Sequence, residues 1–129
     1  MSKPRLLDLF CGAGGAAMGS DVDLAWAAGF FDGEGSVSVH RDRRPGRAVV
    51  VHLDIEQVDP RPLVRFRAAV GRPGAITLRP ARAPNRRAIH RVYMGHSEAI
   101  ATLQALWPYL SEPKREQAER VLRAVEEAA

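Results

Sequence analysis

Four residues, Asp32 to Gly35, carry the clearest chemistry in this sequence, because two carboxylates alternate with two glycines. An apolar run rich in small residues precedes them, which predicts a helix that delivers an acid at its end. Carboxylate and carbonyl oxygens are the ligands that hard cations such as Mg²⁺ bind. The segment therefore indicates half of a metal site, with the carbonyl of Gly33 as a further candidate ligand. The plainer alternative is an acidic turn that leads into a hairpin.

The other half of such a site must come from a second helix. Ala25 and Gly29 lie four positions apart and share one helix face, which Ala28 borders. Small residues on one face let two backbones approach closely. Close packing then brings together two helix C-termini, each with partial negative charge and each followed by an acid. We expect a helix pair with Ala25, Ala28 and Gly29 at its interface and Mg²⁺ at its end.

Length and composition limit the class of protein. The 129 residues, 46% of them hydrophobic, suffice for one domain with a core. No apolar run approaches the roughly 18 residues that span a bilayer, and no secretory signal is visible. The single cysteine, Cys11, excludes an internal disulfide and suits a reducing compartment. We expect a soluble, cytoplasmic protein that has no membrane partner.

Basic residues cluster in the middle of the chain. The net charge is +4, but residues 41–91 hold 13 Arg against four acidic residues. This uneven distribution is typical of nucleic-acid binding. Of the 19 basic residues, only Lys3 and Lys114 are lysines. A GC-rich coding bias explains that preference for Arg equally well, but it does not explain the clustering.

The elements that position these residues follow from periodicity and capping signals. Helical spacing is present at residues 24–31, 60–70, 97–106 and 112–127. Period-two alternation is present at residues 36–40, 48–55, 75–78 and 87–94. The expected capping residues are Asp21 or Asp23, Asp59 with Pro60 at the first helical position, Ser97 and Ser111 at helix starts, and Gly33, Gly35 and Gly71 at helix ends. The resulting order, αββαββαα, predicts an α+β domain with an antiparallel sheet.

The segment from Leu24 to Gly35 resembles the LAGLIDADG motif of the homing endonuclease family, with Ala28-Gly29 and Asp32-Gly33-Glu34-Gly35 at matching places. The resemblance covers about residues 21–127 and implies that family's αββαββα(α) fold for a domain of residues 21–129. In the family the second acid of the motif binds the catalytic metal, so Glu34 is the implied ligand and Asp32 ranks below it. Many members carry Asp at the position of Glu34.

The chain carries one copy of the motif, which has a consequence for its assembly. One copy supplies one helix of the pair, so the resemblance implies a homodimer about a two-fold axis. Such a dimer is expected to recognise a roughly palindromic site in double-stranded DNA.

Three further positions match polar residues around the metal site in single-motif members of the family. They are Gln57, Arg61 and Lys114. Their implied role is to order water and to stabilise charge on the scissile phosphate. The alternative is that Arg61 and Lys114 are solvated surface charges and Gln57 is a turn residue. The resemblance thus implies a Mg²⁺-dependent, double-strand DNA endonuclease, with Glu34 and these three residues as its catalytic set.

The sheet is the expected DNA-binding surface, because the major groove admits a two-stranded ribbon. Side chains that alternate with apolar core residues should face the DNA. They are Ser36, Ser38, His40, His52, Asp54, Arg87, Arg91 and Tyr93, with Glu56 and Ile89 on the same face. Arg41, Arg43, Arg44 and Arg47 at the first hairpin tip are expected to bind phosphates. For any single Arg, an exposed solubilising charge is the simpler explanation.

Residues 5–19 carry a second resemblance. Leu7 to Gly15, followed by Gly19, resembles the glycine-rich S-adenosylmethionine loop of DNA cytosine-5 methyltransferases. The rest of that enzyme is missing, so we expect neither S-adenosylmethionine binding nor methyl transfer. We expect residues 1–20 to be an exon-derived, poorly ordered fragment. The fusion suggests an intron-encoded endonuclease, in a phage or a bacterium, whose target lies in a methyltransferase gene near the codon of Gly19.

One alternative function keeps the same fold. A non-cleaving DNA-binding protein, or a maturase that binds RNA during intron splicing, would retain the sheet and the helix pair without needing the nuclease reaction. The intact Glu34 argues against a degenerate binding protein, but it leaves a dual role open.

Overall fold

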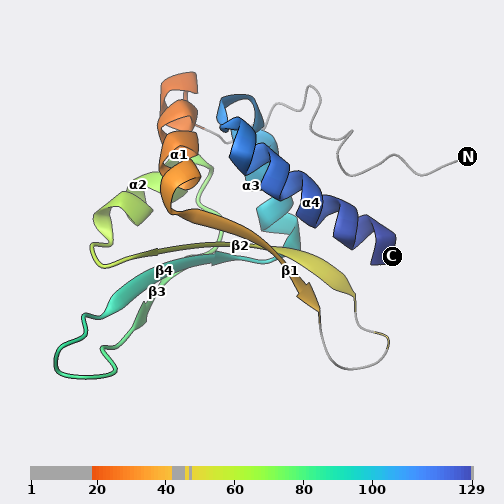
Figure 1. Ribbon diagram of the computed structural model, residues 1–129. Helices are drawn as coiled ribbons and strands as arrows, with labels where there is room; N and C mark the ends of the chain where they lie inside the picture. The colour runs from red at the N-terminus through yellow and green to blue at the C-terminus, as the bar shows by residue number, and fades with distance from the viewer. Residues whose placement is uncertain (1–18, 42–45, 47, 129) are drawn as a thin grey trace, which may run out of the picture.

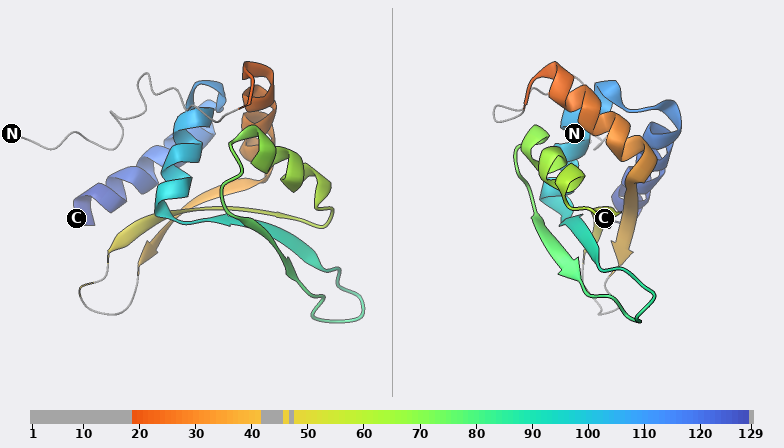
Figure 2. Two further views of the ribbon diagram at one scale, coloured as in Figure 1. Left: turned by 180° about the vertical axis from the view of Figure 1, so that it is seen from behind. Right: turned by 90° about the vertical axis from the view of Figure 1, so that its left-hand side faces the viewer.

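The structure, a computed structural model, describes residues 19–41, 46 and 48–128 of the chain. Within these residues, helices cover one face of a four-stranded antiparallel sheet, and the other face is open (Figures 1 and 2). The elements are α1 (Asp21–Glu34), β1 (Gly35–Arg41), β2 (Val49–Gln57), α2 (Arg61–Ala69), β3 (Ala75–Arg79), β4 (Ile89–Met94), α3 (His96–Leu106), the 3₁₀ turn η2 (Trp107–Tyr109) and α4 (Glu112–Ala128). The predicted α+β class and element order are confirmed.

The sheet has the strand order β1-β2-β4-β3, with every neighbouring pair antiparallel. β2 and β4 are therefore its central strands. The sheet arches beneath the helices, and the loop between β3 and β4 extends away from them (Figure 1). The result is a saddle whose open side faces away from α1.

Alternation along the strands separates the core from the outer face. Val51, Leu53 and Ile55 of β2 are buried under the helices, whereas His52 and Asp54 between them lie on the outer face. β4 repeats this pattern in register with β2. Fully burying one such apolar side chain contributes about 1.5–3 kcal/mol to stability. The predicted division of the sheet into a core face and an outer face is thus confirmed.

The start of α1 differs from the prediction, because Ser20, not Asp21 or Asp23, is the N-cap. The Ser20 hydroxyl accepts the Asp23 N–H at 3.2 Å, and the Asp23 carboxylate accepts the Ser20 N–H at 3.2 Å, which makes a capping box. The Gly19 N–H donates to the Ala69 carbonyl at 3.0 Å. Residues 19 and 20 are thereby held against the domain, while the remaining expectations for residues 1–18 lie outside the described residues.

Other helix boundaries also shift. Gly33 lies inside α1, which ends at Glu34 with Gly35 as its C-cap. Pro60 is the N-cap of α2, not its first residue. Gly95 caps α3 in place of Ser97, because its carbonyl already accepts the Ala99 N–H at 2.8 Å. In the part of the chain that the structure describes, every helix is too short or too polar to cross a bilayer.

Candidate active site

The junction of α1 and β1 places Glu34 beside Gln57. Glu34 is the last residue of α1 and is exposed, and Gln57 is the last residue of β2. The Gln57 Nε2 donates a hydrogen bond to Glu34 Oε2 at 2.9 Å. Because an amide bound to one carboxylate oxygen restricts the rotation of that carboxylate, the pair holds an exposed acid in one orientation. The structure therefore brings together two of the residues that the sequence singled out.

Gly35 makes the sharp passage from α1 into β1 possible. A Cβ at this position would lie 2.0 Å from Cδ2 of Phe31, whose ring is fully buried. Any larger residue would displace the core that anchors Glu34. Gly33 differs, because a Cβ there meets nothing within 4 Å. Its carbonyl belongs to the last turn of α1, where carbonyl groups lack partners within the helix.

Lys114, in the first turn of α4, lies against this junction. Its Nζ donates to the Gly35 carbonyl at 2.8 Å and to Gln117 Oε1 at 3.2 Å. The same ammonium lies 5.4 Å from the centroid of the Phe31 ring. The structure thus places a positive charge next to the residue that follows Glu34.

Asp32 has a structural task that separates it from Glu34. Its carboxylate accepts hydrogen bonds from the Ser111 N–H and the Ser111 hydroxyl, both at 3.0 Å. Ser111 directly precedes α4, so Asp32 ties the motif helix to the start of the last helix. The two acids of the motif point to different partners, which gives the lower rank of Asp32 as a ligand a physical reason.

Arg61 makes its contacts away from the Glu34–Gln57 pair. Its guanidinium binds the Asp59 carboxylate through Nε at 2.9 Å and Nη2 at 2.5 Å, and its side chain is 88% exposed. Hydrogen bonds from Arg61 lower the pKa of Asp59 to about 2, and the pairing raises the pKa of Arg61. The structure does not bring Arg61 to Glu34. Its partner is Asp59, and the sequence offered a clue to this pairing because the acid lies only two residues before the arginine.

The donor set around Glu34 is incomplete in one copy of the chain. Among the described residues, no group of three His, Cys, Asp or Glu side chains could hold a metal ion. With the Asp32 carboxylate bound to Ser111, the remaining oxygen donors at this end of α1 are the Glu34 carboxylate and the carbonyls of the last turn, with that of Gly33 among them. Hard cations need six or more oxygen ligands, so these donors fit such an ion only with contributions from a second copy, water or substrate.

The small-residue face of α1 is partly as predicted. Ala25 and Gly29 are exposed, and a Cβ added at Gly29 would meet nothing within 4 Å. Val22, on the same side, is 75% exposed. Ala28 is fully buried in the chain's own core, so its predicted place at a helix pair was wrong. Another side of α1 packs on α2, where Arg65 lies 3.9 Å from the Trp26 ring centroid.

The outer face of the sheet carries the predicted polar side chains of β1, β2 and β4. Ser36, Ser38 and His40 of β1 are exposed on this face. The rings of His40 and His52 stack with their centroids 4.6 Å apart, and His52 is hydrogen-bonded to the Tyr93 hydroxyl. Burial, followed by the neighbouring His40 and Arg91, lowers the pKa of His52. Burial also raises the pKa of Tyr93.

Arg91 and Asp54 form an ion pair between the two central strands. Arg91 Nε lies 2.8 Å from each carboxylate oxygen of Asp54, and Nη2 binds the same carboxylate. The hydrogen bonds to Asp54 raise the pKa of Arg91. The guanidinium also covers the ring of Tyr93, at 4.7 Å from its centroid. Arg91 is therefore held from two sides.

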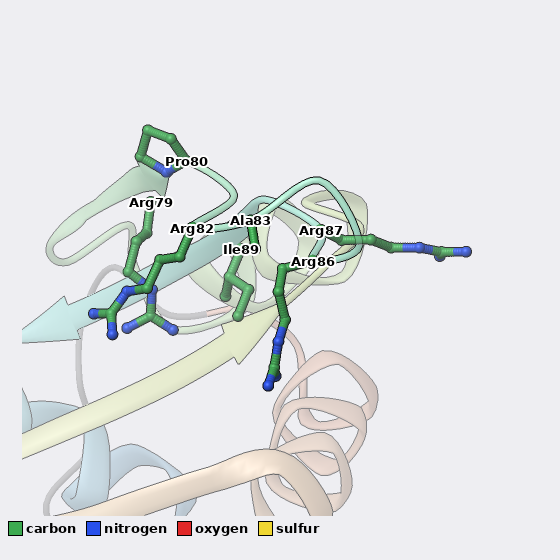
Figure 3. A pocket seen from close by; sticks show the side chains of 7 residues that line it. All are labelled: Arg79, Pro80, Arg82, Ala83, Arg86, Arg87 and Ile89. Carbon is green, nitrogen blue, oxygen red and sulfur yellow. The ribbon is translucent and has the colours of Figure 1, made fainter.

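The end of β3 and the loop between β3 and β4 bring three further arginines, Arg79, Arg82 and Arg86, close to the predicted Arg87. An open hollow of about 400 Å³ there is lined by Arg79, Arg82, Arg86 and Arg87 with Pro80, Ala83 and Ile89. In Figure 3 the side chains of Arg79 and Arg82 point in the same direction, and that of Arg87 points away from them. Arg87 belongs to this loop and not to β4, which begins at Ile89. The sequence contained a clue to this basic cluster, because residues 79–87 hold four arginines and no acidic residue.

The predicted phosphate contacts belong to the end of β1 and to the segment between β1 and β2. Arg41 is exposed at the end of β1. Arg43, Arg44 and Arg47 lie outside the described residues.

No protein-family model matches the chain, and no curated protein matches it either. Several solved structures do match the chain. The homing endonuclease I-CvuI, in complex with I-CreI target DNA in the presence of Mg, is 25% identical, with a TM-score of 0.60 over 81% of this chain and 66% of that one. The LAGLIDADG homing endonuclease I-GzeII in complex with DNA target is 17% identical, with a TM-score of 0.63 over 80% of this chain and 35% of that one.

A third match is the group I intron-encoded homing endonuclease I-CeuI, complexed with DNA. It is 15% identical, with a TM-score of 0.62 over 92% of this chain and 61% of that one. The chain thus spans 35% to 66% of the length of these three structures. The helix that carries Glu34, the antiparallel sheet beneath it and the order of the elements give this chain the fold of the LAGLIDADG homing endonucleases.

Proposed function

We propose that the protein is a site-specific DNA endonuclease that acts as a homodimer and cuts both strands with the help of Mg²⁺. The observation that carries this proposal is the exposed Glu34 carboxylate, oriented by Gln57 at the end of the helix whose sequence resembles the LAGLIDADG motif. The same fold in a 25% identical endonuclease bound to DNA supports it.

The homodimer follows from what one copy lacks. Among the described residues at this end of α1, one chain offers a single available carboxylate, that of Glu34, and the same helix has an exposed strip of small residues that includes Ala25 and Gly29. Pairing two copies of α1 along this strip buries it and brings two Glu34 carboxylates together. Each copy then supplies the ligands that the other needs.

The residues at the junction of α1 and β1 would have different roles in the reaction. Glu34 and the carbonyl of Gly33 would hold the cation, and bound Mg²⁺ would activate water and offset negative charge on the phosphate. Gln57 keeps the Glu34 carboxylate in place. Lys114 adds positive charge beside the junction. Arg61 presents its Nε–Nη2 edge to Asp59, so it would contact a phosphate through the remaining Nη1–Nη2 edge.

The open face of the saddle supplies the DNA-binding surface. In this proposal, side chains of β1, β2 and β4 contact base edges. The arginines at the strand ends and in the loops contact phosphates. The proposed contacts on the sheet are Ser36, Ser38, His40, His52, Asp54, Arg91 and Tyr93. The proposed phosphate contacts are Arg41, Arg43, Arg44, Arg47 and Arg87, extended by Arg79, Arg82 and Arg86.

The origin of the gene is part of the proposal. Residues 5–19 resemble a methyltransferase cofactor loop without the rest of that enzyme, and a similar fold occurs in an intron-encoded endonuclease. An intron-encoded enzyme fused to an upstream exon explains both facts. The target then lies in an intact DNA methyltransferase gene near the codon of Gly19, and no binding of S-adenosylmethionine is expected.

The first test is cleavage of DNA by the full chain. Duplexes that span the Gly19 codon and a plasmid library of random sites are incubated with Mg²⁺ or with a chelator. We expect Mg²⁺-dependent, staggered double-strand cuts that are abolished in Glu34→Gln, whereas binding persists. Glu127→Gln, which removes an exposed carboxylate from the end of α4, is the matched control and should cut normally.

Each outcome of this test decides between functions. Binding without cleavage of any sequence by the wild-type chain would establish the non-cleaving alternative, and preferential binding of RNA would indicate the maturase. Cleavage by Glu34→Gln at the wild-type rate would remove Glu34 from the catalytic set. Cleavage of library sites but not of the methyltransferase duplex would reject only the proposed target gene.

A further inference from the structure

An acid on a surface that faces DNA requires an explanation, because phosphates repel it. Asp54 and Glu56 both lie on the outer face of β2. Each is paired with an arginine of another strand, Asp54 with Arg91 of β4 and Glu56 with Arg79 of β3. The two acids thus neutralise and position cations of the same face.

The Asp54–Arg91 pair is the more tightly built of the two. Asp54 binds both Nε and Nη2 of Arg91, whereas the Glu56–Arg79 contact is a single one at 3.4 Å. The guanidinium of Arg91 packs on the face of the Tyr93 ring, and Tyr93 is itself hydrogen-bonded to His52. The orientation of Arg91 is therefore set before any ligand arrives.

This arrangement leaves a defined edge of Arg91 free for a ligand. A guanidinium is planar and has two edges that each present two parallel N–H groups. Asp54 occupies the Nε–Nη2 edge, so the Nη1–Nη2 edge remains, and the Arg91 side chain is still 40% exposed. Two parallel donors match two adjacent acceptors, which guanine offers in the major groove as O6 and N7.

The position in the sheet favours a base over a phosphate as the ligand. Arg91 and Asp54 lie on β4 and β2, the two central strands, and not on the loops at the ends of the saddle. The pair is also close to neutral as a unit, since Asp54 offsets the charge of Arg91. A phosphate would be repelled by the Asp54 carboxylate, whereas the uncharged edge of guanine would not.

We infer that Arg91 reads a guanine in each half of the DNA target and that Asp54 is the positioning residue that orients it for this contact. The inference rests on the proposed DNA-binding function and adds to it a base and a residue that determines specificity. In a symmetric dimer, the same base pair is required at two positions related by the two-fold axis.

The experiment is selection of bound sites from a duplex library with randomised positions, without cleavage, using the full chain in a chelator or with Ca²⁺. The wild-type chain should enrich a guanine at one position of each half-site. Arg91→Lys keeps the charge but loses the two-donor edge, so it should lose that guanine preference, on the order of 10- to 100-fold, and retain the preferences elsewhere.

Asp54→Asn tests the positioning role separately. It keeps the size of the side chain, so a merely structural residue would leave the base preference unchanged. We expect it to weaken the guanine preference at the same position and to strengthen binding to unrelated DNA, because Arg91 is no longer neutralised. In an Arg91→Lys background, Asp54→Asn should change the base preference no further. Glu56→Gln, the control on the same strand, should leave that position unaltered.

Failure of the inference and failure of the proposed function have different signatures. If the wild-type chain enriches no duplex, the DNA-binding function itself is wrong. If it enriches a site but Arg91→Lys leaves every base preference intact, Arg91 is not a base reader. If Arg91→Lys removes the guanine preference while Asp54→Asn leaves it intact, Asp54 has no positioning role.

Discussion

Gln57 at the end of β2 donates a hydrogen bond to Glu34 at the end of α1, although 23 positions separate them in the chain. The pairing exists because β1 leaves α1 directly and runs antiparallel to β2, which returns the chain to the same junction. Gly35 permits that junction by leaving room for the ring of Phe31. The Glu34 carboxylate is thus supported by two elements of the fold.

Replacement of Gln57 by Ala should slow cleavage without unfolding the protein. The amide makes its hydrogen bond to an exposed carboxylate, and loss of a residue that orients a ligand typically costs about 10- to 100-fold in metal affinity or activity. Single-turnover cleavage at several Mg²⁺ concentrations measures the effect. Gln104→Ala, on α3, is the control; equal losses in the two variants would contradict a role for Gln57 at the site.

Gly29→Leu should abolish the proposed homodimer while leaving the separate chain folded. Within one chain a Cβ at this position meets nothing within 4 Å, and Leu is a better helix former than Gly by roughly 0.5–1 kcal/mol. Between two closely packed copies of α1 the same side chain would collide. Sedimentation and circular dichroism report the two effects. Ala101→Leu, on an exposed part of α3, should remain dimeric, and a dimeric Gly29→Leu would disprove the proposed interface.

Asp32→Ala should lower stability more than it lowers catalysis. The substitution removes the acceptor for the Ser111 N–H and hydroxyl just before α4, and loss of one such hydrogen bond costs about 0.5–1.5 kcal/mol. Chemical denaturation measures this cost. Glu119→Gln, which breaks only an exposed pair with Arg123, should cost less than about 0.5 kcal/mol. Unchanged stability with lost cleavage would instead assign Asp32 to the metal.

The arginines of the β3–β4 loop should contribute binding that is independent of DNA sequence. Arg82 and Arg86 line the hollow, and no ion pair is formed by either within the described residues. Their joint replacement by Ala should weaken binding to all duplexes alike and reduce the slope of affinity against salt by about one per lost phosphate contact. The charge-matched control is Arg120→Ala with Arg123→Ala on α4. A changed base preference in the loop variant would contradict this role.

The stability of the protein should fall as the pH decreases below 6.5, in part because of His52. Burial, His40 and Arg91 lower the pKa of His52 from 6.5 in the folded chain, with Asp54 opposing and His96 adding to the shift. Below pH 6.5 the unfolded chain therefore binds the extra proton first, and folded stability is lost as the pH falls toward the folded pKa.

Chemical denaturation above and below pH 6.5 measures this slope. In His52→Asn the slope should be shallower than in the wild type. Identical slopes in the wild type and His52→Asn would show that His52 contributes nothing to the pH dependence.

Much of the fold could be predicted because its signals are local. Alternation in β2 and β4 identified the outer face, since successive residues of a strand point to opposite sides whatever they pack against. The acid at the end of α1 was recognisable from four consecutive residues and the apolar run before them. Capping was less certain, because Ser20, Asp21 and Asp23 compete for one helix start within four positions.

The partners of the polar side chains depended on long-range packing. α1 has small residues on two sides, and the burial of Ala28 instead of Gly29 follows from where the sheet and α2 meet the helix. Asp32 binds Ser111 across 79 positions, and Arg91 binds Asp54 across 37. Residue type and spacing along the chain predict which groups are available, but the distances between distant strands and helices select which of them pair, since a hydrogen bond forms only within about 3 Å.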